Sequence, residues 1–206
     1  MSERPSRKER QEHTRRCLLE SAGRVFARRG LTQASVDEVA ADAGFTKGAV
    51  YANFASKEEL FLTMLDAKFA ARLDAMDRAL STDEPPEAQA RAAGRDFVTH
   101  LDLDPDWARL FIEAGLHASR DEGFREQLLT RYAAMRERMA ELLRRRAHAG
   151  GFDPGVPFEQ LATMVFAMAN GVAFERLVEP DAVPDDLFSS MLELFTVGAS
   201  SRQSRR

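Results

Sequence analysis

The chain has 206 residues, of which 44% are hydrophobic, and its 29 Lys plus Arg against 33 Asp plus Glu give a formal net charge of -4. On average this balance argues against a nucleic-acid-binding protein, because the phosphates of DNA repel an acidic surface. The positive charge is concentrated at one end, however, since residues 1–30 carry +5, residues 31–60 carry -3 and the other residues carry -6. The first thirty residues therefore make a basic segment on an otherwise acidic chain.

Composition also excludes several classes of protein. No apolar run approaches the roughly 20 residues that span a bilayer. The polar residues 1–16 lack the apolar stretch that follows the basic start of a secretory signal. The one cysteine, Cys17, excludes an intramolecular disulfide framework and a Cys-rich zinc site. We therefore expect a cytoplasmic protein with no membrane partner, no bound metal and no cofactor.

Apolar residues at helical spacing run through almost the whole chain, and no segment alternates long enough to indicate a strand. Leu18, Ala22, Val25 and Phe26 form the stripe of a first helix. Gly30 stands where a glycine would end that helix. The pattern predicts an all-α protein.

Three helix starts follow the first helix. Ser35 and Ser56 each begin an S-x-x-E capping box, in which the serine hydroxyl and the glutamate carboxylate bond backbone N–H groups. Thr46 is a suitable N-cap residue between them. These starts predict short helices near 36–43 and 47–53 and a long helix near 57–80.

Two breaks divide the rest of the sequence. Residues 81–86 contain adjacent prolines, and residues 150–155 combine glycines with a proline, which interrupts a helix. Around them the spacing predicts helices near 87–102, 105–119, 122–149, 157–178 and 184–198. The predicted architecture has about nine helices, in a small N-terminal domain at 1–56, a helical bundle at 57–198 and a disordered basic tail at 199–206.

The two short helices meet the requirements of a helix-turn-helix motif. Such a motif needs a small residue where its helices cross, a residue tolerant of positive φ in the turn, and an apolar residue that holds the second helix. Ala40, Gly44 and Val50 supply these. The second helix carries a cation, a glycine and polar groups that suit phosphates and base edges. An ordinary αα-corner has the same spacing, so both interpretations stay open, although the basic first helix and Lys57 at a helix N-terminus favour DNA.

These residues carry a resemblance to a known family. The stretch from Thr14 to Leu65 includes A-x-x-V-F-x-x-x-G at 22–30 and SVDEVAADAGFTKGAVYANFASKEEL at 35–60. It resembles the N-terminal domain of the TetR family of transcriptional regulators and covers about a quarter of the chain. The resemblance implies a three-helix DNA-binding domain attached to a helical domain that binds an effector and dimerises.

The resemblance also assigns DNA contacts by matching position. Asn53 stands where a histidine is common in the family, so the base preference at this position does not carry over. Phe54 matches the aromatic residue that anchors the recognition helix in the core. The matching DNA-binding residues are Ser35, Thr46, Lys47, Gly48, Tyr51, Asn53 and Lys57.

A dimer face is expected as well. One such motif reads too few base pairs for a specific site, whereas two related by a two-fold axis read a palindrome in successive major grooves. The family pairs through its last two long helices, although their apolar stripes would equally suit the bundle core. The candidate dimer residues are Leu161, Val165, Met168, Val172, Leu187, Met191, Leu194 and Phe195.

The bundle helices also suit a small-molecule pocket. Apolar and Met-rich walls with a few polar groups are typical of such pockets, and bundle cores have the same composition. The family resemblance favours a pocket for a largely apolar effector, and Asn170 needs a hydrogen-bond partner if it is buried. The candidate residues are Trp107, Phe111, His117, Phe124, Met135, Met139, Met164, Asn170 and Phe174.

No arrangement of residues indicates catalysis. Glu113, His117 and Asp121 share one helical face, but its ends are about 12 Å apart at 1.5 Å per residue, too far for one metal ion. Ser119 points away from His117 and Asp121, which excludes a triad. We expect an ion pair on this face and a protein that is not an enzyme.

The sequence therefore predicts a homodimeric, ligand-responsive regulator, a repressor that an effector releases from a palindromic operator. The helix near 57–80 would couple the effector pocket to the DNA-binding domain, through different affinities of the effector for two arrangements. The rival interpretation is a small-molecule-binding or scaffold protein whose helix-turn-helix no longer binds DNA.

Overall fold

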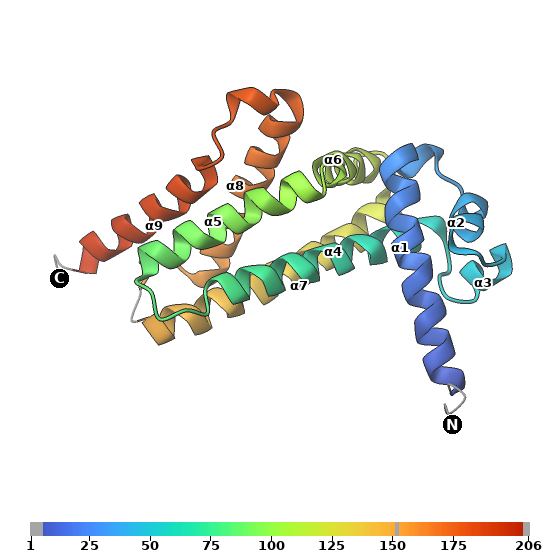
Figure 1. The fold of residues 1–206 in the computed structure, drawn as a ribbon, viewed down its shortest axis with the longest axis horizontal. Helices are drawn as coiled ribbons and strands as arrows, with labels where there is room; N and C mark the ends of the chain where they lie inside the picture. The colour runs from blue at the N-terminus through green and yellow to red at the C-terminus, as the bar shows by residue number, and fades with distance from the viewer. Residues whose placement is uncertain (1–5, 151–152, 204–206) are drawn as a thin grey trace. The chain divides into compact units, whose positions relative to one another are not determined.

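The computed structural model describes residues 6–150 and 153–203, and in these ranges it contains α-helices, one short 3-10 helix and no strand (Figure 1). This confirms the predicted all-α fold. The elements are α1 (Arg7–Gln33), α2 (Val36–Ala43), α3 (Lys47–Tyr51), α4 (Lys57–Ala79), α5 (Pro86–Leu103), α6 (Asp106–Ala118), α7 (Glu122–Gly150), α8 (Phe158–Val178), η1 (Pro180–Ala182) and α9 (Leu187–Gln203).

Helix boundaries differ from the prediction in α1, α3 and α9. Gly30 kinks α1, which continues beyond it to Gln33. α3 ends at Tyr51, so residues 52–53, predicted as helical, form a turn. α9 continues to Gln203, because no proline or glycine interrupts residues 199–203. The disordered tail predicted at 199–206 is thereby corrected over 199–203, and residues 204–206 lie outside the described residues.

The described part of the chain forms two compact units. The first contains residues within Met1–Lys68 and Leu110–Leu128, and the second contains residues within Phe69–Arg109 and Leu129–Arg206. Helices α4, α6 and α7 each contribute one part to each unit. The first unit therefore takes in more than residues 1–56, and the functional boundary at 56 stays a prediction.

The first unit is organised around α1, which α2 contacts, and α3 packs against α2 (Figure 1). Its core joins aromatic rings from helices far apart in the sequence. The Phe26 and Phe61 rings meet edge to face at 5.0 Å, and the Phe124 ring lies 6.4 Å from that of Phe61. All three side chains are buried, and each such burial stabilises the fold by roughly 1.5–3 kcal/mol.

In the second unit α5 runs along α9, and their backbones approach closely at one point. A Cβ atom added to Gly94 would lie 2.5 Å from Cα of Ser189, so only glycine fits there. The buried Ser189 hydroxyl donates a 3.2 Å hydrogen bond to the carbonyl of Arg91. An ion pair of 2.9 Å between Arg176 and Asp102 connects α8 to α5.

Helix α8 corrects the expectation that no segment of the chain is long and apolar enough to span a bilayer. Among the described helices it is the one whose length and composition would allow it to cross a bilayer. A core helix of a water-soluble bundle meets the same criterion. Only 28% of its most apolar segment is buried within the protein, which leaves an apolar face without cover.

Candidate nucleic-acid interface and apolar cavity

Local hydrogen bonds set the geometry of the helix-turn-helix. At the start of α2 the N–H of Glu38 donates to the Ser35 hydroxyl at 3.2 Å, and the N–H of Ser35 donates back to the Glu38 carboxylate at 3.0 Å. This reciprocal capping lowers the pKa of Glu38. Gly44 then ends α2 in the left-handed conformation, with φ of 73°. The Thr46 hydroxyl begins α3 by accepting from the N–H of Ala49 at 3.3 Å.

The predicted recognition helix has one buried and one exposed side. Val50 is buried, as is Phe54 just beyond the helix, and together they hold α3 against the unit. Lys47, Gly48 and Tyr51 lie on the exposed side, where 51% of the Tyr51 surface is accessible. Exposed cationic and aromatic polar groups beside a glycine suit a phosphate backbone and base edges.

Both lysines among the predicted DNA contacts already have partners within the protein. Lys47 Nζ donates to Asp37 at 2.9 Å, which raises the pKa of the lysine. Lys57 Nζ donates to the carbonyls of Thr32 at 3.3 Å and Ala34 at 3.2 Å. Lys57 therefore closes the end of α1 in this structure, and a role in binding phosphate stays a prediction.

Asn53 is held at the end of the motif. Its Nδ2 donates to the carbonyl of Ala49 at 2.8 Å, while its Oδ1 is buried and has no hydrogen-bond partner among the described residues. Arg15 Nη1 donates to the backbone carbonyl of Asn53 at 2.7 Å and the guanidinium lies 4.3 Å above the ring of Phe54. Arg15 thus fixes the end of the recognition helix, a role that sequence reasoning missed because the contact spans two helices.

Ion pairs reduce the positive charge of the basic segment. Arg24 and Arg28 of α1 pair with Asp42 of α2 at 2.6 and 3.1 Å. Arg29 pairs with Glu38 at 3.3 Å. The charge of the first thirty residues therefore overstates the positive field of the folded unit, because acidic side chains of α2 compensate it.

The second unit contains a partly open, mainly apolar cavity of about 80 Å³. Four of the residues predicted for an effector pocket line it, Trp107, Met135, Met139 and Asn170. Asn170 donates to the carbonyl of Phe166 at 2.8 Å, so this amide has the partner that a buried position requires. The lining residues are Phe69, Arg72, Leu73, Ala75, Met76, Ala93, Asp96, Phe97, His100, Trp107, Met135, Met139, Val165, Phe166, Ala169, Asn170, Phe188 and Leu192.

The remaining predicted pocket residues do not line this cavity. Phe111, His117 and Phe124 belong to the first unit, where the His117 and Phe124 rings pack at 4.6 Å. Met164 is half-buried outside the lining, and Phe174 is 47% exposed. This cavity therefore gives no support to these assignments, because apolar spacing marks a helix face without saying which neighbour covers it.

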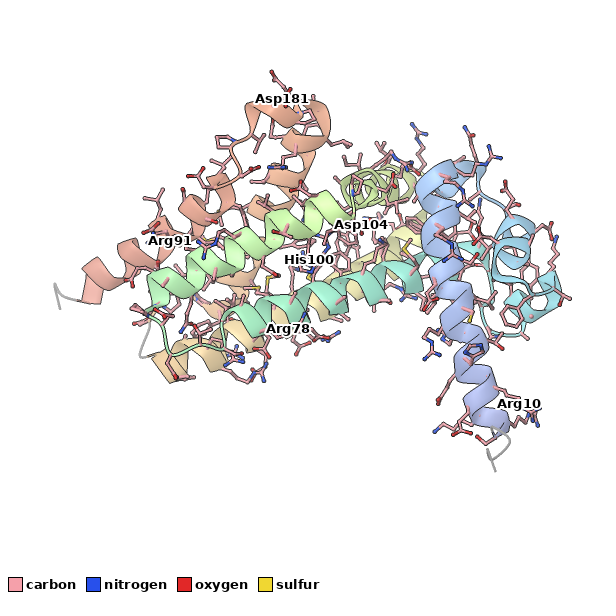
Figure 2. The ribbon with its side chains drawn as sticks, viewed as in Figure 1. Arg10, Arg78, Arg91, His100, Asp104 and Asp181 are labelled. Carbon is pink, nitrogen blue, oxygen red and sulfur yellow. The ribbon has the colours of Figure 1, made fainter. Side chains whose placement is uncertain are left out.

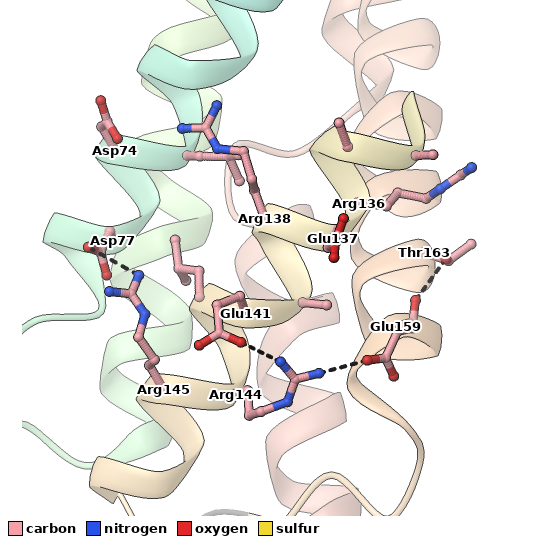
Figure 3. Close-up of a pocket in the computed structure, with 15 residues that line it drawn as sticks. Asp74, Asp77, Arg136, Glu137, Arg138, Glu141, Arg144, Arg145, Glu159 and Thr163 are labelled. Atoms are coloured by element: carbon pink, nitrogen blue, oxygen red, sulfur yellow. Dashed lines mark hydrogen bonds and ion pairs between the residues drawn. The ribbon is translucent and has the colours of Figure 1, made fainter. Parts of the chain in front are cut away.

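Another hollow in the second unit is of a different kind. It is an open groove of about 840 Å³ lined by acidic and basic side chains of α4, α7 and α8 (Figure 3). Arg144 bonds both Glu141 and Glu159, and Arg145 pairs with Asp77 (Figure 3). These paired charges at an open surface do not suit a largely apolar ligand.

The chain matches two family models of transcriptional regulators. Residues 18–64 match the model of bacterial regulatory proteins of the TetR family, and residues 86–196 match that of the C-terminal domain of BetI-type transcriptional repressors. The second match covers more than half of the chain. The chain belongs to the TetR family of transcriptional regulators.

Individual TetR-family proteins are similar over most of the chain. The uncharacterised regulator YfiR of Bacillus subtilis is 28% identical over 167 residues, covering 80% of each chain. The repressor AcnR of Corynebacterium diphtheriae is 29% identical and covers 75% of this chain and 76% of its own. The structure of FadR from Bacillus subtilis in complex with stearoyl-CoA superposes with a TM-score of 0.68, at 19% identity, over 89% of this chain and 98% of that one.

Known TetR-family proteins are regulators, and the residues tested for catalysis have structural roles here. Glu113 accepts a hydrogen bond from the N–H of Leu31, and Asp121 accepts one from the N–H of Phe124 at the start of α7. The ion pair predicted on this helical face stays a prediction. Both carboxylates bond backbone N–H groups that a helix leaves without partners.

The predicted dimer residues of this TetR-family chain divide into two groups. Leu161, Val165 and Val172 are buried within the second unit, which corrects the prediction that they form an outer face. Leu187, Leu194 and Phe195 of α9 are exposed, and Met168 and Met191 are partly exposed. The exposed face of α8 consists instead of Ala167, Gly171, Phe174 and Val178, which recur at helical spacing.

Proposed function

We propose that the protein is a homodimeric repressor that binds a palindromic operator and releases it when a small, largely apolar effector enters the cavity of the second unit. The observation that carries the proposal is the exposed side of α3, held in place by the buried Val50 and Phe54. AcnR is named a repressor, and FadR was solved with stearoyl-CoA, an apolar chain on a polar group. The protein would act in the cytoplasm.

The helices that line the cavity provide a route for coupling. α4 contributes Phe69 and Arg72 to the cavity, and its first turn belongs to the first unit. α6 contributes Trp107 to the cavity and Glu113 to the bond with Leu31. An effector that binds one arrangement of these helices more tightly shifts the population toward it, and operator affinity follows.

Dimerisation would supply the second DNA-binding domain that a palindromic operator requires. The exposed apolar faces of α8 and α9 are the support for this part of the proposal, because water-soluble monomers rarely leave such continuous patches uncovered. Gly171 in this face permits close approach of two backbones. Two-fold pairing then matches the symmetry of a palindromic site.

The test is the substitution Tyr51→Ala in an operator-binding assay. Fluorescence anisotropy on palindromic DNA from upstream of the protein's own gene, at matched salt, should show affinity weakened by about tenfold or more. Leu129→Ala is the control, because Leu129 is 50% exposed, close to the value for Tyr51, and lies on α7. Full affinity in Tyr51→Ala would remove the recognition helix from the interface.

A salt titration distinguishes the proposed repressor from a small-molecule-binding or scaffold protein that no longer binds DNA. A DNA-binding protein that contacts several phosphates loses affinity steeply as salt rises, because bound counterions are released. A small-molecule-binding or scaffold protein with a vestigial motif would show weak binding with a flat salt response.

A further inference from the structure

The cavity contains one buried cation. Arg72 of α4 lines it, and only 16% of its side chain is exposed. The guanidinium carbon lies 4.3 Å from the centre of the Trp107 ring and 5.9 Å from that of Phe97. Arginine on a helix surface normally extends its head group to water, whereas this one is held among aromatic rings.

Part of the hydrogen-bonding capacity of Arg72 is unused among the described residues. Nη1 is buried and has no hydrogen-bond partner among the described residues. Asp104 is 4.0 Å from Nη2, beyond hydrogen-bond distance. Burial lowers the pKa of Arg72 to about 10, and Asp104 only partly opposes this shift. An unpaired buried donor is unfavourable, so its retention in a cavity points to a ligand that completes it.

The other ionisable groups of the cavity already bond each other. His100 and Asp96 both line it, and Nδ1 of His100 lies 2.7 Å from the carbonyl oxygen and 3.3 Å from the carboxylate of Asp96. Figure 2 shows His100 on α5 and Asp104 directly after that helix. Among the lining groups the unused capacity for an anion is therefore on Arg72.

We propose that the effector is a small apolar carboxylic acid whose carboxylate pairs with the Arg72 guanidinium. This rests on the proposed function, in which the cavity is the effector site. The planar guanidinium offers parallel N–H groups that match the two oxygens of a carboxylate. One cation balances a monoanion and leaves a phosphate dianion undercompensated in an apolar site.

Cavity size and lining define the remainder of the ligand. About 80 Å³ is below the range of roughly 300–1,000 Å³ typical of drug-sized ligands. A single ring or a short chain fits best, among Phe69, Trp107 and Phe166. Met76, Met135 and Met139 line the cavity as well, and their flexible side chains adapt to the shape of a ligand.

The experiment compares acids with their neutral amides. Phenylacetate and octanoate, with phenylacetamide and octanamide, are titrated into the apo dimer and followed by thermal shift and calorimetry. Specific binding raises the melting temperature by mass action. The acids should bind wild type about tenfold tighter than the amides or better, because only they pair with the cation.

Variants of Arg72 test whether this residue causes the preference for acids over amides. Arg72→Met should remove the acid preference while leaving amide binding, since methionine keeps the apolar wall. Arg78→Met is the matched control, because Arg78 lies on the same helix, is exposed and does not line the cavity (Figure 2). If Arg72→Met does not fold, Arg72→Gln replaces it, and circular dichroism checks both.

Several results would overturn the inference: equal binding of acids and amides to wild type, an acid preference retained without Arg72, or no binding of either acid. Operator affinity of the ligand-free protein is measured in parallel. Intact operator binding without acid binding rejects the carboxylate ligand and leaves the repressor standing. Loss of operator binding in wild type itself rejects the proposed function.

Discussion

Glu113 on α6 accepts a 2.7 Å hydrogen bond from the backbone N–H of Leu31, directly after the point where α1 kinks. Gly30 at the kink has φ of 75° and ψ of 170°, which residues with a side chain rarely adopt. A Cβ on Gly30 would lie 2.6 Å from Oε2 of Glu113. The carboxylate therefore fills the space beside the glycine and bonds an N–H that the kink takes out of the helix.

The kink predicts the effect of Gly30→Ala. Strain at positive φ and displacement of Glu113 should lower the free energy of unfolding by about 1–3 kcal/mol, measured by urea denaturation. Gly23→Ala is the control in the same helix, since an added Cβ there meets nothing within 4 Å. The control should be neutral or stabilise by up to about 1 kcal/mol. Equal stability of the two variants would show that the kink needs no glycine.

A substitution at Gly48 can distinguish an effect on DNA binding from an effect on folding. A Cβ on Gly48 would meet only the Thr46 hydroxyl, at an ordinary 3.7 Å. Gly48→Ala should therefore keep or raise stability while weakening operator affinity by about tenfold, as the methyl group obstructs close approach. Gly115→Ala, where an added Cβ meets nothing within 4 Å, should likewise keep or raise stability but should leave operator affinity unchanged. Wild-type affinity in Gly48→Ala would mean that DNA does not come close at this position.

The proposed dimer face predicts that α9 contains a position where an added charge prevents dimerisation. Leu194 is 73% exposed in the protomer, and Leu194→Asp would bury a carboxylate in an apolar interface. We expect light scattering to show monomers for this variant. Leu103→Asp, at a position that is 77% exposed on α5, should remain dimeric. A dimeric Leu194→Asp protein would place the interface elsewhere.

The carboxylate of Asp42 should account for part of the stability that the first unit loses at acidic pH. Its pKa is lowered from 3.8 to about 2, first by hydrogen bonds from Arg24 and then from Ser21 and Arg28. A lowered folded pKa stabilises the protein above the unfolded value, and this stability is lost as the pH falls through about 2. Because the arginines are more than half exposed, the contribution is under about 1 kcal/mol.

Melting temperatures measured between about pH 5 and pH 2 test this assignment. Asp42→Asn should melt slightly earlier than wild type near neutral pH and should lose less stability on acidification. Asp83→Asn, in the exposed turn before α5, is the control and should follow wild type throughout. A wild-type acid profile in Asp42→Asn would exclude the Arg24 pair as a source of the effect.

Capping residues, turn glycines and prolines predicted most of the helices and the helix-turn-helix motif. The capping boxes at Ser35 and Ser56, the turn at Gly44 and the prolines after residue 80 act within a few residues, so the sequence states them directly. The end of α3 and the length of α9 were misjudged. Helix ends fray, and no strong breaker marks either position.

Charge and apolar spacing predicted the functional residues less well than the helices. Their effect depends on contacts between residues far apart in the sequence, which the sequence pattern does not reveal. The basic first helix is compensated by Asp42, and Lys57 bonds carbonyls at the end of α1. Arg72 had no place in the predicted pocket, since an arginine in a helical pattern resembles a solvated position.

The sequence by itself determined the all-α fold, the helix-turn-helix and the family, because caps, turns and helical spacing are local properties of the chain. Tertiary structure decided which apolar face became core, cavity or exposed surface. Val165 is buried, Leu194 is exposed, and Arg72 lines the cavity, although each stands on a helix that carries apolar residues at helical spacing. An apolar face specifies burial without specifying a partner, and only the packing of all helices together assigns one.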